Sequence, residues 1–323
     1  MKFIFFGTPQ PAVEILDILK RHNLVPALIV TNPDKPQGRH LKFTPSPVKE
    51  WALQNNISLL QPESASDSDF LYKLKAISYQ LFVVVAYGQI LRKELLDIPK
   101  HGTLNVHYSL LPKYRGASPI ESQILADDKN AGISIMLLDE AMDHGPIIAQ
   151  ERLKIHDSRF MIQGGLAWPP TATELRKASN EVAGKLLADI MSKWVAGEIT
   201  PKEQNHSEAT YTKKFTKSDG EIDFANDPYK NFLKIQAFEG SIGTFFYSPF
   251  PKGSTRVGEG EGFKSSASED FGPSFKKGGT EEKKIRVIIK SAEFKDGKLT
   301  ILRVIPEGKK ETDYTEFLRG IQQ

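Results

Sequence analysis

The sequence predicts an α/β protein whose first domain has a mostly parallel, Rossmann-like sheet and whose second domain is a smaller β structure. In the first domain, apolar runs of strand length alternate with helix-like segments, the order typical of βαβ units. One run, LFVVVA at residues 81–86, is apolar throughout, which favours a strand buried on both faces inside a parallel sheet. Right-handed crossovers between such strands produce a Rossmann-like sheet.

The elements of the first domain follow in order along the chain. The strand-like runs are residues 3–6, 25–30, 81–86, 103–107 and 133–138. The helix-like segments are residues 13–21, 48–54, 70–76 and 120–126, and a long helical pattern at residues 174–196 closes the domain. Gly197 and the polar residues 198–206 form a connection. We therefore place one domain at residues 1–200 and the other at residues 201–323.

The second domain has a β pattern. Residues 244–247, 285–289 and 299–305 are strand-like, and the sequence Lys295-Asp296-Gly297-Lys298 predicts a hairpin turn. Residues 249–284 are rich in glycine, serine, lysine and glutamate, with few large aliphatic side chains. Such a segment buries too little apolar surface to offset its ordering entropy, so we expect a flexible insertion.

Composition excludes several classes of protein. The 323 residues include no cysteine, which excludes disulfides and thiolate metal sites, and the histidines show no metal-ligand spacing, so we expect no metal. No apolar run approaches the roughly 20 residues of a membrane span, and MKFIFFG is typical of a short strand and not of a signal peptide. We expect a cytoplasmic monomer. The net charge of +3 is too small to indicate a nucleic-acid partner.

Three polar residues are candidates for catalysis. Apolar and polar side chains alternate along residues 103–107, which puts Asn105 and His107 on one face of the predicted strand. The pair lies near the carboxyl end of the strand, where open α/β sheets bind their ligands. Asp143 stands in a turn just after the next strand-like run, and a neighbouring parallel strand would bring it alongside.

These side chains suit acyl transfer to an amine. An asparagine amide donates to a developing oxyanion, an imidazole stabilises the oxyanion or relays a proton, and a carboxylate orients the imidazole or accepts the proton. Taken separately, an Asn-x-His pair and an Asp-x-Gly turn are more typical of an ordinary strand face and an ordinary turn. The chain has no G-x-G-x-x-G and no phosphate-binding lysine loop, so binding of dinucleotides or nucleoside triphosphates has little support.

A basic loop at residues 34–42 is the local signal for a polyanionic partner. Lys35, Arg39, His40 and Lys42 stand among proline, glutamine and glycine, with only Asp34 opposing them. Such a loop can follow the phosphates of a nucleic acid. It is also compatible with an ordinary solvated surface loop.

Together, these motifs resemble the folate-dependent formyltransferase family. Residues 101–120, HGTLNVHYSLLPKYRGASPI, and residues 137–147, LLDEAMDHGPI, match its Asn-x-His, Ser-x-x-Pro-x-Tyr-x-Gly and Asp-x-Gly elements. The opening FFGTPQPAVEIL and residues 31–52, 61–63, 207–224 and 304–320 resemble the members that act on methionyl-tRNA. The resemblance covers nearly the whole chain.

The resemblance implies a reaction and roles for named residues. The formyl group of 10-formyltetrahydrofolate would pass to the α-amine of methionyl initiator tRNA, for translation initiation. Asn105 and His107 would stabilise the oxyanion, and Asp143 would orient His107 and accept the proton. Ser134 would hold a water molecule. The second domain would be a small open barrel of OB type, a fold that commonly binds oligonucleotides.

The resemblance also assigns the binding sites of the two substrates. The folate would bind at Ala86, Tyr87, Gly88, Gln89, Ile90, Leu91, Ser109, Pro112, Leu138, Asp139, Glu140 and Ala141. For Ile90 and Leu91, plain core packing is an equal alternative. The acceptor end of the tRNA would meet Lys35, Arg39, His40 and Lys42, with Arg39 at the position of the family's central arginine.

Two departures from the family pattern stand beside the catalytic carboxylate. His144 replaces a threonine or serine, and we expect its side chain to turn outward, the alternative being a shift in the pKa of Asp143. Ala141 stands where glycine is usual. Other functions remain open: formylation of an aminosugar nucleotide or of glycinamide ribotide, hydrolysis of formyltetrahydrofolate, and tRNA binding without catalysis.

Overall fold

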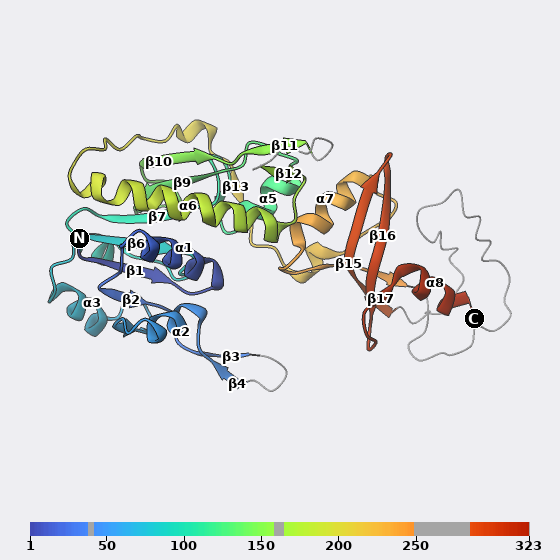
Figure 1. The fold of residues 1–323 in the computed structure, drawn as a ribbon, viewed down its shortest axis with the longest axis horizontal. Coiled ribbons are helices and arrows are strands. Elements are labelled where there is room, and N and C mark those ends of the chain that lie inside the picture. Colours follow the sequence, from blue (N-terminus) through green and yellow to red (C-terminus); the bar gives the residue numbers. More distant parts are fainter. Residues whose placement is uncertain (38–41, 158–164, 249–284, 323) are drawn as a thin grey trace. The chain divides into compact units, whose positions relative to one another are not determined.

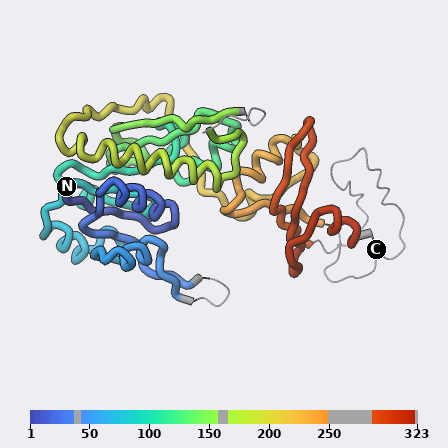
Figure 2. Tube along the Cα trace, viewed as in Figure 1, coloured from blue at the N-terminus to red at the C-terminus, as the bar shows by residue number. Residues whose placement is uncertain are grey.

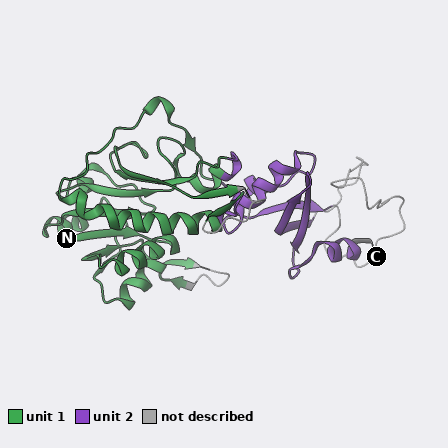
Figure 3. Ribbon diagram, turned by 45° about the horizontal axis from the view of Figure 1, so that its top comes forward, with its two compact units in different colours: residues 1–123, 128–168, 174–214 green, residues 124–127, 169–173, 215–323 purple. Residues whose placement is uncertain are grey.

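The computed structural model describes residues 1–37, 42–157, 165–248 and 285–322. Arg39, His40 and the expected insertion at residues 249–284 lie outside the described residues. The chain forms two compact units, with residues 1–123, 128–168 and 174–214 in the first and residues 124–127, 169–173 and 215–323 in the second (Figure 3). The domain division at residue 200 stays a prediction.

The core of the first unit is a seven-stranded sheet that is mostly parallel, as predicted. Its strands lie side by side in the order β10 (Ile147–Arg152), β9 (Gly132–Leu137), β7 (Thr103–His107), β6 (Leu81–Val85), β1 (Phe3–Gly7), β2 (Leu28–Val30) and β5 (Leu59–Leu60). The strands from β7 to β5 pair in parallel, whereas β9 is antiparallel to both of its neighbours. In Figure 2 the blue amino-terminal strands and the green strands β9 and β10 lie toward opposite edges of this sheet. All five residues of β6 are buried, as the unbroken apolar run indicated.

Helices accompany this sheet, and each of the predicted ones is present. They are α1 (Gln10–Arg21), α2 (Pro47–Gln54), α3 (Ser68–Lys75), α4 (Lys93–Leu96), α5 (Pro119–Leu125) and α6 (Ala172–Val195); only the short α4 was not predicted. Figure 1 shows α1 and α6 side by side, and a Cβ on Gly184 of α6 would lie 2.6 Å from Cδ1 of Ile18 of α1. Within the described parts of the chain, no helix is long and apolar enough to cross a membrane.

Three two-stranded sheets complete the first unit, and one of them corrects a prediction. They pair β11 (Ile155–Asp157) with β12 (Leu166–Trp168), β8 (Arg115–Gly116) with β13 (Tyr211–Thr212), and β3 (Lys35–Gln37) with β4 (Lys42–Thr44). The β3–β4 hairpin occupies the segment that we predicted as a loop. Pro36 favoured the loop, but a proline is tolerated on an edge strand. The base of the hairpin is fixed by Asp34, which binds Lys49 (2.7 Å) and Gln61 (2.9 Å).

The second unit is a small domain around an antiparallel sheet, as expected. Its strands follow the order β14 (Thr244–Ser248), β15 (Ile285–Lys295), β16 (Lys298–Pro306) and β17 (Thr312–Asp313), and α7 (Pro228–Phe238) and α8 (Tyr314–Gln322) pack against them. Short 3₁₀ helices span His206–Glu208 in the first unit and Lys217–Gly220 in the second.

Local turn and cap residues explain two elements of the second unit. Asp296 and Gly297 form the β15–β16 turn with φ angles of 50° and 76°, the left-handed pair that a tight hairpin requires, so the predicted turn is confirmed. Helix α7 was not predicted. Asp227 nevertheless caps it by accepting from the N–H of Lys230 (2.9 Å), and Pro228 follows at its first turn, which are signals of a helix start.

Candidate active site

Asn105 and His107 lie on β7 two residues apart, so their side chains leave the sheet on the same face. The strand runs between β6 and β9, where Asn105 is the neighbour of Val84 and His107 is the neighbour of Ser134. His107 is buried and Asn105 is half-buried. The alternation in the sequence therefore placed this pair correctly.

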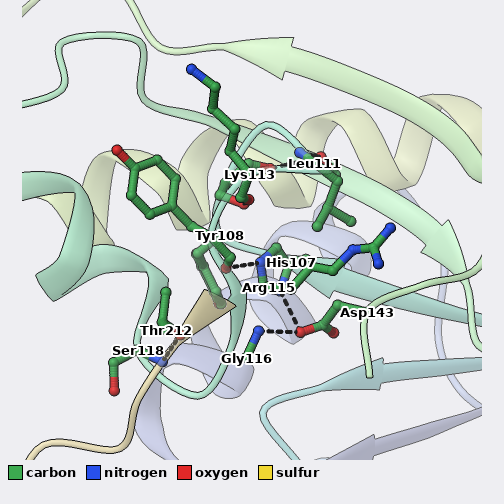
Figure 4. Close-up of polar contacts among 12 residues, drawn as sticks. His107, Tyr108, Leu111, Lys113, Arg115, Gly116, Ser118, Asp143 and Thr212 are labelled. Carbon is green, nitrogen blue, oxygen red and sulfur yellow. Dashed lines mark hydrogen bonds and ion pairs between the residues drawn. The ribbon is translucent and has the colours of Figure 1, made fainter. Parts of the chain in front are cut away.

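The imidazole of His107 is oriented by the turn that follows β7. Its Nε2 lies 2.9 Å from the backbone carbonyl oxygen of Tyr114. Because a carbonyl only accepts, Nε2 must carry a proton, and in the neutral ring Nδ1 then carries a lone pair. Nδ1 faces Oδ2 of Asp143 at a distance of 3.6 Å (Figure 4).

Asp143 comes close to His107 from the loop between β9 and β10. Its backbone is left-handed, with a φ of 48°, and its Oδ2 accepts a 2.6 Å hydrogen bond from the backbone N–H of Gly116 (Figure 4). We expected a parallel strand to deliver this residue, which is wrong, because β9 runs antiparallel to β7. A hydrophobic pattern shows that a strand exists, but it does not show the strand's direction.

Burial is the main influence on the protonation of His107. It lowers the pKa of the imidazole below its ordinary value of 6.5, although the carboxylate of Asp143 acts in the opposite direction. The ring is therefore uncharged near neutral pH. Nδ1 and Oδ2 are then both acceptors, so no hydrogen bond joins them directly. A donor group placed between them would be bound by both.

Ser134 and Ser109 hold the turn that shapes this site. The hydroxyl of Ser134 donates to the carbonyl oxygen of Ser109 (2.6 Å) and accepts from the N–H of Leu111 (2.9 Å) and the side chain of Gln150 (2.8 Å). Its one donor and two acceptor positions are thus occupied. The water-holding role that we expected for Ser134 would require one of these bonds to break. The hydroxyl of Ser109 donates to the carbonyl oxygen of Lys113 (2.6 Å).

The expected folate-binding segment after β6 is held by polar side chains. The carbonyl oxygen of Tyr87 accepts from Thr8 Oγ1 (3.0 Å) and from Asn32 Nδ2 (2.8 Å). The amide of Gln89 donates to Asn32 Oδ1 (2.7 Å) and accepts from the N–H of Ala65 (2.7 Å). These bonds hold the carbonyl group of Tyr87 and the side chain of Gln89.

The side chains of this segment divide into exposed and buried ones. Ile90 is 86% exposed, which excludes core packing for it, whereas Leu91 packs against the core. Ala86 and Gly88 are exposed and left-handed, with φ angles of 48° and 86°. The side chain of Tyr87 belongs to the core, where burial raises the pKa of its phenol to about 12. The exposed parts of the segment are therefore Ala86, Gly88 and the side chain of Ile90.

The second expected folate-binding segment is the loop after β9. Leu138 packs against the core, whereas Glu140 and Ala141 are exposed. The carboxylate of Asp139 accepts from the N–H of Ala141 (3.0 Å) and lies 2.7 Å from Nδ1 of His144. This carboxylate therefore ties the start of the loop to its end.

The side chain of His144 is partly turned outward, with 41% of its surface exposed. Its ring stacks on the ring of His206, with centroids 4.0 Å apart and an interplanar angle of 1°. His206 stands 62 residues further along the chain. The sequence gives no sign of this contact, because a stacking partner so far away leaves no local pattern.

Residues 201–212, here called the connecting arm, are part of the site and not only a link between domains. Lys202 pairs with Ile147 at the start of β10, and β13 pairs with β8. The N–H of Thr210 donates to the carbonyl oxygen of half-buried Pro112 (3.3 Å), and its hydroxyl accepts from the N–H of Tyr114 (2.8 Å). We predicted residues 198–206 as a polar connection, because their partners lie far away in the sequence and leave no local signal.

Two buried residues of the site were also missed. Arg115 is 1% exposed and Gln204 is 5% exposed, and the guanidinium donates to Oε1 of Gln204 at 2.6 Å, across 89 positions of sequence. Because an arginine in a short turn motif is usually a surface residue, we did not predict that Arg115 is buried against Gln204. Among the residues that the structure describes, no group of three or more His, Asp or Glu side chains is arranged to hold a metal ion.

Known proteins match this chain over most of its length. A model of the formyl transferase family matches residues 1–159. A methionyl-tRNA formyltransferase from Thermodesulfovibrio yellowstonii is 37% identical over 317 residues, which cover 98% of this chain and 95% of the relative. The chain belongs to the methionyl-tRNA formyltransferase family. Another member, from Thermus thermophilus, is 36% identical over 328 residues, which cover 99% of this chain and 96% of that one.

Solved structures of formyltransferases share the fold. The methionyl-tRNA formyltransferase from Clostridium thermocellum aligns with a TM-score of 0.54 at 16% identity, covering 97% of this chain and 99% of the other. A sugar N-formyltransferase from Shewanella aligns with a TM-score of 0.57 at 15% identity, covering 77% and 93%. At these identities the similarity concerns the fold alone, and it confirms the predicted formyltransferase fold.

Proposed function

We propose that this chain transfers the formyl group of 10-formyltetrahydrofolate to the α-amine of methionyl initiator tRNA, for translation initiation. The proposal rests on the gap between Nδ1 of His107 and Oδ2 of Asp143, two acceptors 3.6 Å apart that an amine N–H would bridge. The names of relatives that match nearly the whole chain support methionyl-tRNA as the acceptor. We expect the protein to act as a monomer in the cytoplasm, without a metal ion.

In the proposed reaction, the amine nitrogen attacks the formyl carbon and the formyl oxygen becomes an oxyanion. The amide of Asn105 donates to this oxyanion. The amine loses a proton to His107, the bond between the formyl carbon and N10 of the folate breaks, and N10 takes up a proton. Because Nδ1 of neutral His107 accepts, we assign this ring first to proton acceptance. It stabilises the oxyanion only after it has been protonated, with Asp143 beside it.

The binding sites of the two substrates are proposals too. The folate is assigned to residues 86–91 and 138–141 with Ser109 and Pro112, and the held backbone and exposed Ile90 of the first segment support this assignment. The tRNA is assigned to the β3–β4 hairpin. Lys35 is exposed on β3, which leaves its charge available to a phosphate. The family resemblance alone assigns Arg39, His40 and Lys42 to the tRNA site.

The lowered pKa of His107 predicts the pH dependence of kcat/KM. If the neutral ring accepts the amine proton, protonation of the ring lowers the rate as the pH drops through this pKa, which burial holds below 6.5. A ring that must already be protonated would instead lose activity as the pH rises through the same value. We expect kcat/KM for formyl transfer, measured from about pH 5 to 8, to fall at the acidic end. The second profile would contradict the assignment of His107 as proton acceptor.

Gly145 allows the loop of Asp143 to pass close to β9. A Cβ there would collide with the backbone carbonyl oxygen of Leu137, so Gly145→Ala is expected to displace Asp143. Since a misplacement of about 1 Å can cost on the order of 10²-fold in rate, we expect kcat to fall by about that factor in steady-state assays. The control is Gly197→Ala. The φ angle of Gly197 is 76°, but a Cβ added there would meet no neighbouring atom within 4 Å. Gly197→Ala should lower the melting temperature and leave kcat unchanged. Equal kcat values for Gly145→Ala and Gly197→Ala would contradict the close approach of the Asp143 loop to β9.

A panel of acceptors tests the proposed function. Labelled formyl is offered from 10-formyltetrahydrofolate to methionyl initiator tRNA, to an aminosugar nucleotide, to glycinamide ribotide and to water alone. We expect formyl-methionyl-tRNA as the dominant product. Transfer only to another amine or to water would contradict methionyl-tRNA as the acceptor but would still support formyl transfer. Binding of tRNA without any transfer would contradict the proposal that this chain is an enzyme.

A further inference from the structure

We propose that Gln204 is a positioning residue for Asp143 and that Arg115 holds it in place. The inference rests on the proposed function, because Asp143 is the carboxylate of the proposed reaction. It extends the site from the three residues of the sequence motifs to a buried network on the connecting arm.

Gln204 holds the loop of Asp143 on both sides of His144. Its side-chain Nε2 donates to the backbone carbonyl oxygen of Asp143 (2.9 Å) and to that of Gly145 (2.7 Å). Both N–H bonds of the amide are therefore used on the backbone of one short loop. Asp143 has a φ of 48°, a conformation that costs energy for a residue other than glycine and persists only when its surroundings hold it.

Arg115 determines which way the amide of Gln204 points. Its Nε and Nη2 donate to Oε1 of Gln204, at 3.2 Å and 2.6 Å. Since a guanidinium only donates, the atom that faces it must be the amide oxygen, and the amide nitrogen must face the two carbonyl groups. A buried guanidinium needs acceptors around it. These contacts therefore specify one orientation for both side chains.

The same guanidinium supports a second contact with the loop. Nη2 of Arg115 donates to Nδ1 of His206 (2.9 Å), so this nitrogen of the imidazole carries the lone pair. The ring of His206 then stacks on the ring of His144, which follows Asp143 directly. The loop is thus held through its carbonyl groups by Gln204 and through a side chain by His206.

The placement of Arg115 links this network to the carboxylate itself. The next residue, Gly116, donates its N–H to Oδ2 of Asp143 at 2.6 Å. Residues 115 and 116 therefore hold both ends of Asp143, its carboxylate directly and its backbone through Gln204. The distance between Oδ2 and Nδ1 of His107 depends on both contacts. A shift of about 1 Å in such a geometry can cost on the order of 10²-fold in rate.

The substitution Gln204→Glu separates positioning from packing. Glutamate keeps the shape and the acceptor for Arg115, but it replaces the two N–H donors by an oxygen that faces two carbonyl oxygens. We expect kcat for formyl transfer to fall by about 10- to 100-fold, with KM for both substrates nearly unchanged. Gln54→Glu is the matched control, the same amide-to-acid change at the exposed end of α2, and it should leave kcat unchanged. Gln204→Met, which has similar length and no charge, is the second variant if glutamate prevents folding.

Titration of the His107 ring by NMR provides a readout that needs no turnover. Asp143 raises the pKa of His107 against the effect of burial, so displacing the carboxylate should move the titration of His107 to lower pH in Gln204→Met, a variant that adds no charge of its own. A fall in kcat together with this shift supports the proposal. Unchanged kcat, or a fall in kcat with an unchanged titration, overturns it. If the wild-type protein formylates no acceptor, the proposed function fails, and the titration still tests whether Gln204 positions Asp143.

Discussion

Replacing Asp143 by asparagine is expected to lower kcat by about 10³-fold while KM for both substrates changes little. Asparagine has the same size and keeps an acceptor for the N–H of Gly116, which now binds Oδ2 at 2.6 Å. It removes the negative charge that opposes the effect of burial on the pKa of His107. The proton taken from the amine would then lie on an imidazolium without a counter-charge. The effect therefore falls on turnover, measured by steady-state formyl transfer.

Asp97→Asn is the matched control for this substitution. Asp97 is exposed and forms an ion pair with Lys93 on α4, so the same chemical change there should leave kcat within the error of the assay. Full turnover in Asp143→Asn would remove the carboxylate from the mechanism. A large rise in KM with normal kcat would instead make Asp143 a binding residue.

Replacing His107 by alanine is expected to lower kcat by about 10²- to 10³-fold. The change removes the proton acceptor Nδ1 and leaves the carbonyl oxygen of Tyr114 without its 2.9 Å partner. His107→Gln distinguishes these two losses, because its amide can still donate to Tyr114 but its donor–acceptor pattern supplies no base. We expect both variants to lose turnover to a similar extent.

His22→Ala, at an exposed position after α1, is the control for general effects of losing a histidine. Recovery of most of the turnover in His107→Gln would contradict the assignment of Nδ1 as proton acceptor. It would show instead that the hydrogen bond to Tyr114 is the main contribution of this side chain.

Elements that depend on local sequence could be predicted. The buried strand at residues 81–85, the common face of Asn105 and His107, and the turn at Asp296 and Gly297 all follow from side-chain alternation, apolar runs or turn chemistry within a few residues. The motif resemblance then joined Asp143 to the pair on β7. Local pattern and motif combination together led to the three residues that we propose as catalytic.

Features that depend on distant partners could not be predicted. The antiparallel direction of β9 is set by its pairing with β7 and β10. The stacking of His144 on His206 and the bonds of Gln204 join residues that are about 60 positions apart or more. Neither contact leaves a periodic signal in the sequence. The partners of the connecting arm are also distant in the sequence, so only its polar composition could be used for prediction. Polar composition alone indicates a linker.

The most direct test of the central claim is a single-turnover measurement of formyl transfer to methionyl initiator tRNA. Wild-type protein and Asp143→Asn are each mixed with labelled 10-formyltetrahydrofolate and the charged tRNA, and the product is identified at each time point. We predict formyl-methionyl-tRNA from the wild type, and a chemical step slowed by about 10³-fold in the variant with the same dependence on substrate concentration. Equal rates in the two proteins, or label released only as formate, would contradict it.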